Sequence, residues 1–373
     1  MIELPFDCVA DICLFLNTKN MLTLCMTSKQ LYRKILNSKS IMIKKRFTVC
    51  SNILNLDFMD NLSYKIYNLN ISNNKSIKDN DFKYLRGIHT LYMMNCNQIE
   101  ITDIAFKYLK DIHTLHMYGC NQNSITDKAF ENLKGINFLN MTNCNQYTIT
   151  DEAFEHLKGI DTLYISGCNQ VTDKAFKNLK GIHTLYMLNC NQETITEKAF
   201  EHLQGIHTLK MSKCNQNTIT DKTFEHLQGI HTLNIQECNQ NTVTDKAFIY
   251  LKGICTLNML GCNQNTITDK AFIYLKGIRT LNMSGCNQNT ITDKAFIYLR
   301  GIRTLNMSGC NQNTITDNAF QYLECIRVLN MNNCNQHTIT DKAFQYLQNI
   351  HTLNMSRCKQ NNTTKIFAYR GQI

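Results

Sequence analysis

One cysteine recurs at a fixed interval through most of this chain, and no other feature restricts the possible folds so strongly. Twelve of the 18 cysteines in the 373 residues follow one another at intervals of 24 residues, with a single interval of 22. They are Cys96, Cys120, Cys144, Cys168, Cys190, Cys214, Cys238, Cys262, Cys286, Cys310, Cys334 and Cys358. A period of this length indicates a stack of structural repeats.

Each period has the pattern of a strand, a loop and a short helix. In the repeat of Cys286, Leu281 and Met283 alternate with polar residues, which predicts a short half-buried strand. Thr292 or Asp293 then supplies a helix N-cap. The apolar residues that follow share one face of about two helical turns: Ala295, Phe296 and Leu299. One such unit buries too little apolar surface to fold alone, so stacking on neighbours must stabilise it, and the sequence predicts a solenoid.

The regular cysteines raise two alternatives, disulfides and zinc. One cysteine per unit places every thiol in the same environment, which packing explains better than pairing does. No C-x-x-C pair occurs, and structural zinc sites need closely spaced ligand pairs. We therefore expect a ladder of reduced, buried thiols, with no metal and no cofactor.

The pattern Ile-x-x-Leu-x-Met-x-x-Cys-Asn, followed by Ile-Thr-Asp-x-Ala-Phe-x-x-Leu, resembles the cysteine-containing leucine-rich repeat. The resemblance implies an α/β fold: a horseshoe-shaped solenoid with parallel strands on the concave face and short helices on the convex face. It also implies that the cysteine turns inward against neighbouring backbone. We expect about 13 repeats of about 24 residues over residues 66–358. The first is degenerate and carries Asn74 in place of the cysteine.

Residues 1–46 do not follow the repeat. Pro5, the only proline, is tolerated in a first helical turn, and the apolar residues after it predict two or three short helices. On physical grounds alone, these helices cap the open end of the solenoid. Residues 47–65 would then connect the two parts, and residues 359–373 form a tail that departs from the repeat.

The same N-terminal segment resembles an F-box, the motif that binds the Skp-family adaptor of cullin-based ubiquitin ligases. The resemblance lies in Leu4-Pro5-x-Asp7, in Leu16-Asn17-x-Lys19-Asn20, and in Ser28-Lys29-x-Leu31. It implies a small α-helical domain ahead of the repeats, with adaptor-binding positions at Leu4, Pro5, Ile12, Leu16 and Leu22. The implied partners are the Skp-family adaptor, the cullin ligase and a protein substrate.

The strand side chains that point away from the core change in character along the array. They are aromatic and apolar in the first half, and mostly Asn and Ser in the second. Because tyrosine with apolar neighbours is typical of interface hot spots, we expect the first half to bind substrate. The candidate residues are Tyr92, Met94, His116, Tyr118, Phe138, Tyr164, Tyr186 and Leu188. The alternative is drift among duplicated repeats.

A second stripe occupies the residue after the repeat isoleucine. It consists of His89, His113, His183, His207 and His231, and then of Arg279, Arg303 and Arg327. Stacked histidines can bind metal, but one per strand fits a solvated edge better. The arginines suit an acidic or phosphorylated partner.

Charge and motifs argue against several other functions, and they leave a basic solenoid that binds nucleic acid as the weakest of three alternatives. The net charge is +10, but residues 1–85 hold half of it, so the array is too weakly basic to predict nucleic-acid binding. No P-loop, G-x-S-x-G, H-E-x-x-H or zinc C-x-x-C motif occurs, so we expect no catalysis. No apolar stretch reaches the ~18 residues of a membrane span, and no signal peptide is evident. We therefore expect an intracellular protein, cytoplasmic or nuclear.

Together, the resemblances to an F-box and to leucine-rich repeats imply the substrate-recognition subunit of an SCF-type ubiquitin ligase, with the target bound on the concave face. The alternative is a protein-binding scaffold of the same fold, outside the ubiquitin system, whose N-terminal helices only cap the solenoid. The bias toward Asn, Ile and Lys and the near-identical repeats resemble F-box proteins encoded by giant viruses of amoebae. That resemblance implies residence in a host cell.

Overall fold

The computed structural model describes residues 6–16, 46–48 and 67–358, together with single positions between residues 20 and 38. The chain divides into two compact units, Met1–Leu179 and Lys180–Ile373.

The first unit starts with helix α1 (Phe6–Phe15) and continues with a series of short parallel strands. The strands are β1 (Arg46–Thr48), β2 (Asn68–Asn70), β3 (Thr90–Tyr92), β4 (Thr114–His116), β5 (Phe138–Asn140) and β6 (Thr162–Tyr164). Each pairs with the next in chain order, in parallel. The helical turns between them are η1 (Asp79–Leu85), α6 (Asp103–Phe106), α7 (Asp127–Phe130), η2 (Glu131–Leu133), η3 (Asp151–His156) and α8 (Asp173–Phe176), where η marks a 3-10 helix.

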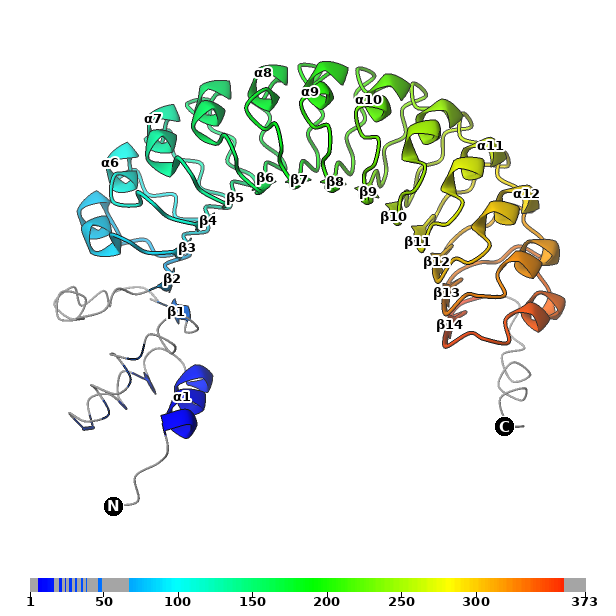
Figure 1. The fold of residues 1–373 in the computed structure, drawn as a ribbon, viewed down its shortest axis with the longest axis horizontal. Helices are drawn as coiled ribbons and strands as arrows, with labels where there is room; N and C mark the ends of the chain where they lie inside the picture. The colour runs from blue at the N-terminus through cyan, green and yellow to red at the C-terminus, as the bar shows by residue number, and fades with distance from the viewer. Residues whose placement is uncertain are drawn as a thin grey trace. The chain divides into compact units, whose positions relative to one another are not determined.

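The second unit repeats the same plan. Its strands are β7 (Thr184–Tyr186), β8 (Thr208–Lys210), β9 (Thr232–Asn234), β10 (Thr256–Asn258), β11 (Thr280–Asn282), β12 (Thr304–Asn306), β13 (Val328–Asn330) and β14 (Thr352–Asn354). Its helical turns are α9 (Glu197–Glu201), α10 (Asp221–Glu225), η4 (Asp245–Leu251), α11 (Asp269–Phe272), η5 (Ile273–Leu275), α12 (Asp293–Phe296), η6 (Ile297–Leu299), η7 (Asp317–Tyr322) and η8 (Asp341–Tyr346). Within each unit the strands line the inner side and the helical turns the outer side (Figure 1). The predicted solenoid is confirmed.

Strand β1 lies across the expected end of the N-terminal domain at residue 46. Phe47 of β1 pairs with Leu69 of β2, the register in which leucine faces leucine between later strands. Sequence analysis did not identify this strand, because residues 46–48 carry neither the leucine nor the cysteine of the repeat. The expected domain boundaries stay predictions, and the tail at 359–373 lies outside the described residues.

The core of each repeat is the apolar set that the sequence pattern selected. Leu281, Met283, Ala295 and Phe296 have no exposed surface, and Leu299 is almost fully buried. The same positions are buried in nearly every other repeat, so each leucine packs beside the leucine of the next strand. Since one repeat offers only eight buried apolar side chains, its core is completed by its neighbours.

The Thr-Asp step plays two separate roles that the sequence left open. The Thr292 hydroxyl caps helix α12 by accepting the Lys294 N–H at 3.2 Å. The Asp293 carboxylate instead accepts the backbone N–H and the hydroxyl of Thr316 in the next repeat, at 2.7 and 2.6 Å. Threonine is therefore the cap, and aspartate ties adjacent repeats together.

The repeat cysteine forms a second tie between repeats. Cys286 Sγ donates to the carbonyl oxygen of Met259, in the preceding repeat, at 3.0 Å. The equivalent bonds elsewhere measure 2.9 to 3.2 Å, and the described cysteines are free thiols. Burial raises the pKa of Cys96 to about 11 and that of Cys262 to about 12, so these thiols keep the proton that they donate. The expected ladder of buried thiols is confirmed.

Asn74, which replaces the first cysteine, is buried but bonds differently. Its Oδ1 accepts the backbone N–H of Ser76 at 2.9 Å and of Ile77 at 3.2 Å. The amide oxygen therefore stabilises the loop of its own repeat, whereas the thiol of a later cysteine reaches back to the repeat before it.

Among the described helices, none has both the length and the apolar character needed to span a bilayer.

We predict that Cys286→Ala lowers the free energy of unfolding by about 1–3 kcal/mol, measured by urea denaturation. The Met259 carbonyl keeps the Cys262 N–H at 3.1 Å but loses the thiol, and the sulfur leaves a small cavity. Cys325→Ala is the matched control, because Cys325 is exposed, and it should change stability by less than about 0.5 kcal/mol. Equal stability of the two variants would contradict a structural role for the ladder.

Candidate functional site

Four of the predicted substrate-binding residues form one continuous row on the strand face of the first unit. The rings of Tyr92 and His116 are stacked, with centroids 4.4 Å apart and planes 10° apart. His116 lies 4.7 Å from Phe138, and Phe138 lies 5.3 Å from Tyr164, both tilted. We call Tyr92, His116, Phe138 and Tyr164 the aromatic row. Its members are half-buried, so each side chain keeps part of its surface accessible to a partner.

The row is continuous because Phe138 replaces a threonine. In the strand register, Asn140 stands between His116 and Tyr164, and its amide would interrupt the rings. Phe138 lies two residues earlier on the same face of β5 and fills this gap. The strand alternation was sufficient to find these residues, but their ring contacts follow only from the structure.

The remaining candidates of the first unit lie two residues beyond the ends of strands β3 and β4. Tyr118 is exposed, and its hydroxyl accepts Nδ2 of Asn143 at 3.1 Å. Met94 is half-buried. Both extend the apolar surface from the ends of β3 and β4 toward the loops that follow.

Tyr186 and Leu188 belong to the second unit. Both are half-buried, and the ammonium of Lys210 lies 4.5 Å from the Tyr186 ring centroid, a cation–π contact. Lys210 was not among the candidates, although its place directly after the strand leucine is the signal that identified Tyr186. The use of all these residues in binding stays a prediction.

The histidine stripe is also stacked within each unit. His89 and His113 lie 4.4 Å apart, and Tyr67, which was not a candidate, lies 4.2 Å from His89. In the second unit, His183, His207 and His231 follow at 4.6 and 4.5 Å.

Stacking changes the acidity of these histidines. Desolvation, and then repulsion from His231 and His183, lower the pKa of His207. Desolvation, and then repulsion from His113, lower the pKa of His89. In the part of the chain that the structure describes, no three His, Cys, Asp or Glu side chains are grouped closely enough to hold a metal ion.

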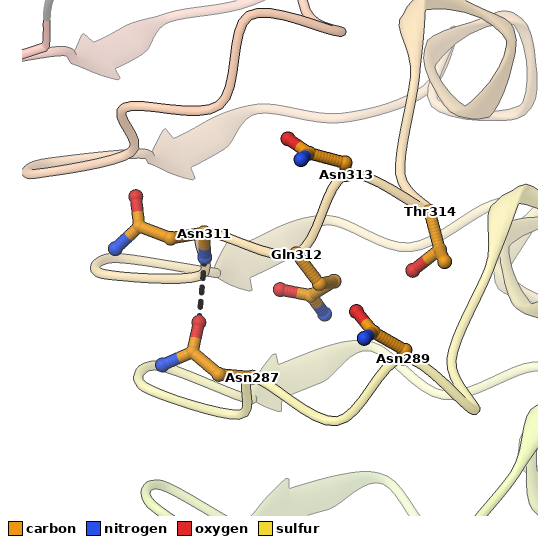
Figure 2. Close-up of a pocket in the computed structure, with 6 residues that line it drawn as sticks. All are labelled: Asn287, Asn289, Asn311, Gln312, Asn313 and Thr314. Carbon is orange, nitrogen blue, oxygen red and sulfur yellow. Dashed lines mark hydrogen bonds between the residues drawn. The ribbon is translucent and has the colours of Figure 1, made fainter.

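Shallow pockets recur on the loops that follow the strands of the second unit. One of about 470 Å³ is lined by Asn287, Asn289, Asn311, Gln312, Asn313 and Thr314, shown in Figure 2. The Asn311 N–H donates to Asn287 Oδ1 at 2.6 Å, a bond that recurs between repeats. An equivalent pocket of about 520 Å³ lies one repeat earlier. These pockets contain amides and hydroxyls only, so they offer neither acid–base chemistry nor an aromatic anchor, and we do not place the site there.

Helix α1 exposes an apolar face within the region that resembles an F-box. Val9 and Cys13 are buried, whereas Ile12 and Phe15 are 41% and 93% exposed. Residues three apart share one side of a helix, so Ile12 and Phe15 form a single apolar face. Of the expected adaptor-binding positions, Ile12 lies on this face, Leu16 is half-buried, and Leu4, Pro5 and Leu22 lie outside the described residues. Phe15 was missed, although its spacing from Ile12 would have identified it.

Comparison with known families agrees with this architecture. The model of the BspA type leucine rich repeat region matches in six copies, over residues 51–183, 123–255, 169–303 and 254–373. The F-box domain model matches residues 1–41. The chain therefore belongs to the BspA-type leucine-rich-repeat family and carries an F-box domain at its N-terminus. Both are modules of protein–protein interaction. No curated protein matches the chain.

Solved structures with similar folds come from distant sequences. One is the Toll–Spatzle complex of Drosophila, at 15% identity and a TM-score of 0.60, over 79% of this chain and 45% of that one. Another is the yeast complex of Rad7 and Elc1, at 16% identity and a TM-score of 0.52, over 91% and 88%. A third is the internalin InlF of Listeria monocytogenes, at 17% identity and a TM-score of 0.55, over 80% and 88%. The chain spans about half the length of the Toll chains, and these likenesses establish the fold alone.

We predict that His207 titrates below the ordinary histidine range of about 6.5, measured by NMR of the ring protons. Since the folded state binds this proton less readily than the unfolded state, His207 favours folding more as the pH rises through that range. His183→Asn with His231→Asn should raise the pKa of His207, and Asn137 shows that asparagine fits this position. A His207 pKa unmoved by the double substitution would contradict the coupling.

Proposed function

We propose that this protein is the substrate-recognition subunit of an SCF-type ubiquitin ligase. Helix α1 would bind a Skp-family adaptor, which links the chain to the cullin, while the aromatic row would bind the protein to be modified. The observation that carries the proposal is the exposed face of Ile12 and Phe15, inside the segment matched by the F-box model. The chain itself would contribute no catalytic group, and it would act in the cytoplasm or nucleus.

The exposed apolar face of α1 supports an adaptor contact. An isolated apolar pair on a small helix needs a cover, and burying each side chain contributes roughly 1.5–3 kcal/mol to association. Asp7 and Asp11 are exposed on the same helix, so the apolar pair has polar neighbours, as the core of an interface has a polar rim. Leu4, Pro5, Leu16 and Leu22 remain proposed contacts or supports by the F-box resemblance.

The four ring-bearing side chains of the aromatic row support it as the substrate site. Four ring-bearing side chains on adjacent strands offer a large and rigid contact surface, because each ring has few rotatable bonds and its neighbours hold it in place. The corresponding positions later in the array are small amides such as Asn258 and Asn282, which hold far less apolar surface. Tyr118 and Met94 would extend the contact, and Tyr186 with Leu188 stay proposed substrate contacts of the second unit.

We predict that Ile12→Asp with Phe15→Asp abolishes co-purification of the intact chain with a Skp-family adaptor and cullin. A charge on the exposed face disrupts the apolar contact without entering the core, so the variant should stay folded by circular dichroism. Asp11→Asn is the matched control on the same helix and should retain the adaptor, because a charge on the rim of an interface contributes little to affinity. If the intact chain captures no adaptor, the helices act as a cap, and the alternative of a repeat scaffold outside the ubiquitin system takes the place of this proposal.

We predict that Tyr92→Asn with Tyr164→Asn removes the proteins that co-purify with the intact chain, by about tenfold or more in quantitative mass spectrometry. Asparagine already occupies this strand position at Asn140 and Asn234, so the fold should tolerate it. Asn234→Ala with Asn258→Ala is the control at equivalent positions. Undiminished capture by the tyrosine variant, with adaptor binding intact, would show that the substrate site lies elsewhere.

A further inference from the structure

Three consecutive repeats of the second unit carry an exposed isoleucine on their outer turns. Ile249, Ile273 and Ile297 are 45%, 43% and 41% exposed. The same position holds Glu201 and Glu225 in the preceding repeats, and glutamine in the two that follow. Elements η4, η5 and η6 pack side by side, so the three isoleucines form one short apolar row.

A row of cations lies beside the apolar row. Lys252, Lys276 and Arg300 each follow an isoleucine by three residues, at the ends of η4, η5 and η6, and all are exposed. In a 3-10 turn, side chains three residues apart eclipse one another. Each cation therefore stands on the same side of its turn as the isoleucine before it.

A second row of cations follows at the starts of the strands. Arg279, Arg303 and Arg327 are exposed and occupy successive rungs of one backbone ladder, since each N–H after Arg279 donates to the arginine before it, at 3.0 and 2.9 Å. Strand spacing puts these rungs about 4.8 Å apart. We call the six residues of both rows the cationic edge.

The cationic edge has no internal counter-charge. None of its six side chains forms an ion pair with a carboxylate in the described part of the chain, and Arg300 packs only over the Tyr322 ring, at 5.2 Å. Glu324 stands at the equivalent turn end of the next repeat, one position along the row after Arg300, and it forms no ion pair with the edge in the described part of the chain, so one end of the edge borders a carboxylate. Six neighbouring cations repel one another, and an anionic partner would relieve this.

We propose that this surface is a second docking site, which binds an acidic peptide segment through apolar anchors. The acidic side chains would contact the cationic edge, and apolar side chains between them would cover Ile249, Ile273 and Ile297. The apolar row argues for a peptide rather than a nucleic acid, because phosphates use the cations but leave the isoleucines exposed. The site is separate from the aromatic row and from α1, and it does not depend on the proposed function.

Fluorescence anisotropy of the full chain tests this proposal with two labelled probes. One is a peptide of about ten residues in which Leu recurs every third position among Glu, the spacing that puts the leucines on one side of a polyproline II chain, and the other is an all-Glu peptide of equal length. Ile249→Gln with Ile273→Gln and Ile297→Gln should weaken the Leu-containing peptide about tenfold and leave the all-Glu peptide unchanged. Lys252→Gln with Lys276→Gln and Arg300→Gln should weaken both. Glutamine fits both positions, as Gln321 and Gln228 show.

The matched control repeats the cation substitution where no isoleucine is exposed. Lys134→Gln with Lys158→Gln should leave both affinities unchanged, because glutamates precede these lysines by three residues. If either triple variant binds the Leu-containing peptide with unchanged affinity, the proposal is overturned. The proposal would also be overturned, in favour of a phosphate-binding edge, if the chain bound a single-stranded DNA of about ten nucleotides more tightly than the peptide. In that case the isoleucine substitutions would leave the affinity for the DNA unchanged.

Discussion

Hydrogen bonds between successive repeats are the interaction on which the rest of the structure depends. No repeat has enough apolar side chains to form a core of its own, so each must be held against its neighbours. Three side chains do this at the same positions in nearly every repeat: the cysteine thiol on the preceding carbonyl, the aspartate on the next threonine, and the asparagine amide on the next backbone N–H. Together with the parallel strand pairs, these bonds satisfy polar groups that burial would otherwise leave without partners.

Because these hydrogen bonds and the core hold the backbone in place, the residue types at the remaining surface positions can differ between repeats. The ladder and core positions are almost invariant from one repeat to the next, whereas the strand residues and outer-turn residues change in blocks. Aromatic rings gather on β3 to β6, and isoleucines and cations gather on η4 to η6 and the strands that follow. Because the backbone beneath them repeats, neighbouring side chains of one kind fall automatically into rows. A rigid row of this sort can bind a partner without first ordering its own residues.

The sequence was sufficient to predict the fold, since a 24-residue period carrying strand, cap and helix signals admits few structures. It also identified the residues of the aromatic row, because alternation along a strand separates inward from outward positions. It could not predict that Phe138 bridges His116 and Tyr164, since ring contacts depend on rotamers in adjacent repeats. Strand β1 was missed because it lies outside the repeat, where no leucine or cysteine period marks a strand. Phe15 also lies outside the repeat, and only its spacing of three residues from Ile12 indicates the face that it shares.

In the function that we propose, one chain connects an adaptor bound at α1 to a client protein bound on the aromatic row. The most direct test replaces Phe138 with the photo-crosslinking residue p-benzoylphenylalanine, irradiates the protein in cells, and recovers complexes through a tagged Skp-family adaptor. We expect a client covalently attached at position 138 in the adaptor-bound material, and no such client there when Ile12 and Phe15 are both replaced by aspartate. Clients attached at position 138 but never recovered with the adaptor would contradict the proposed function.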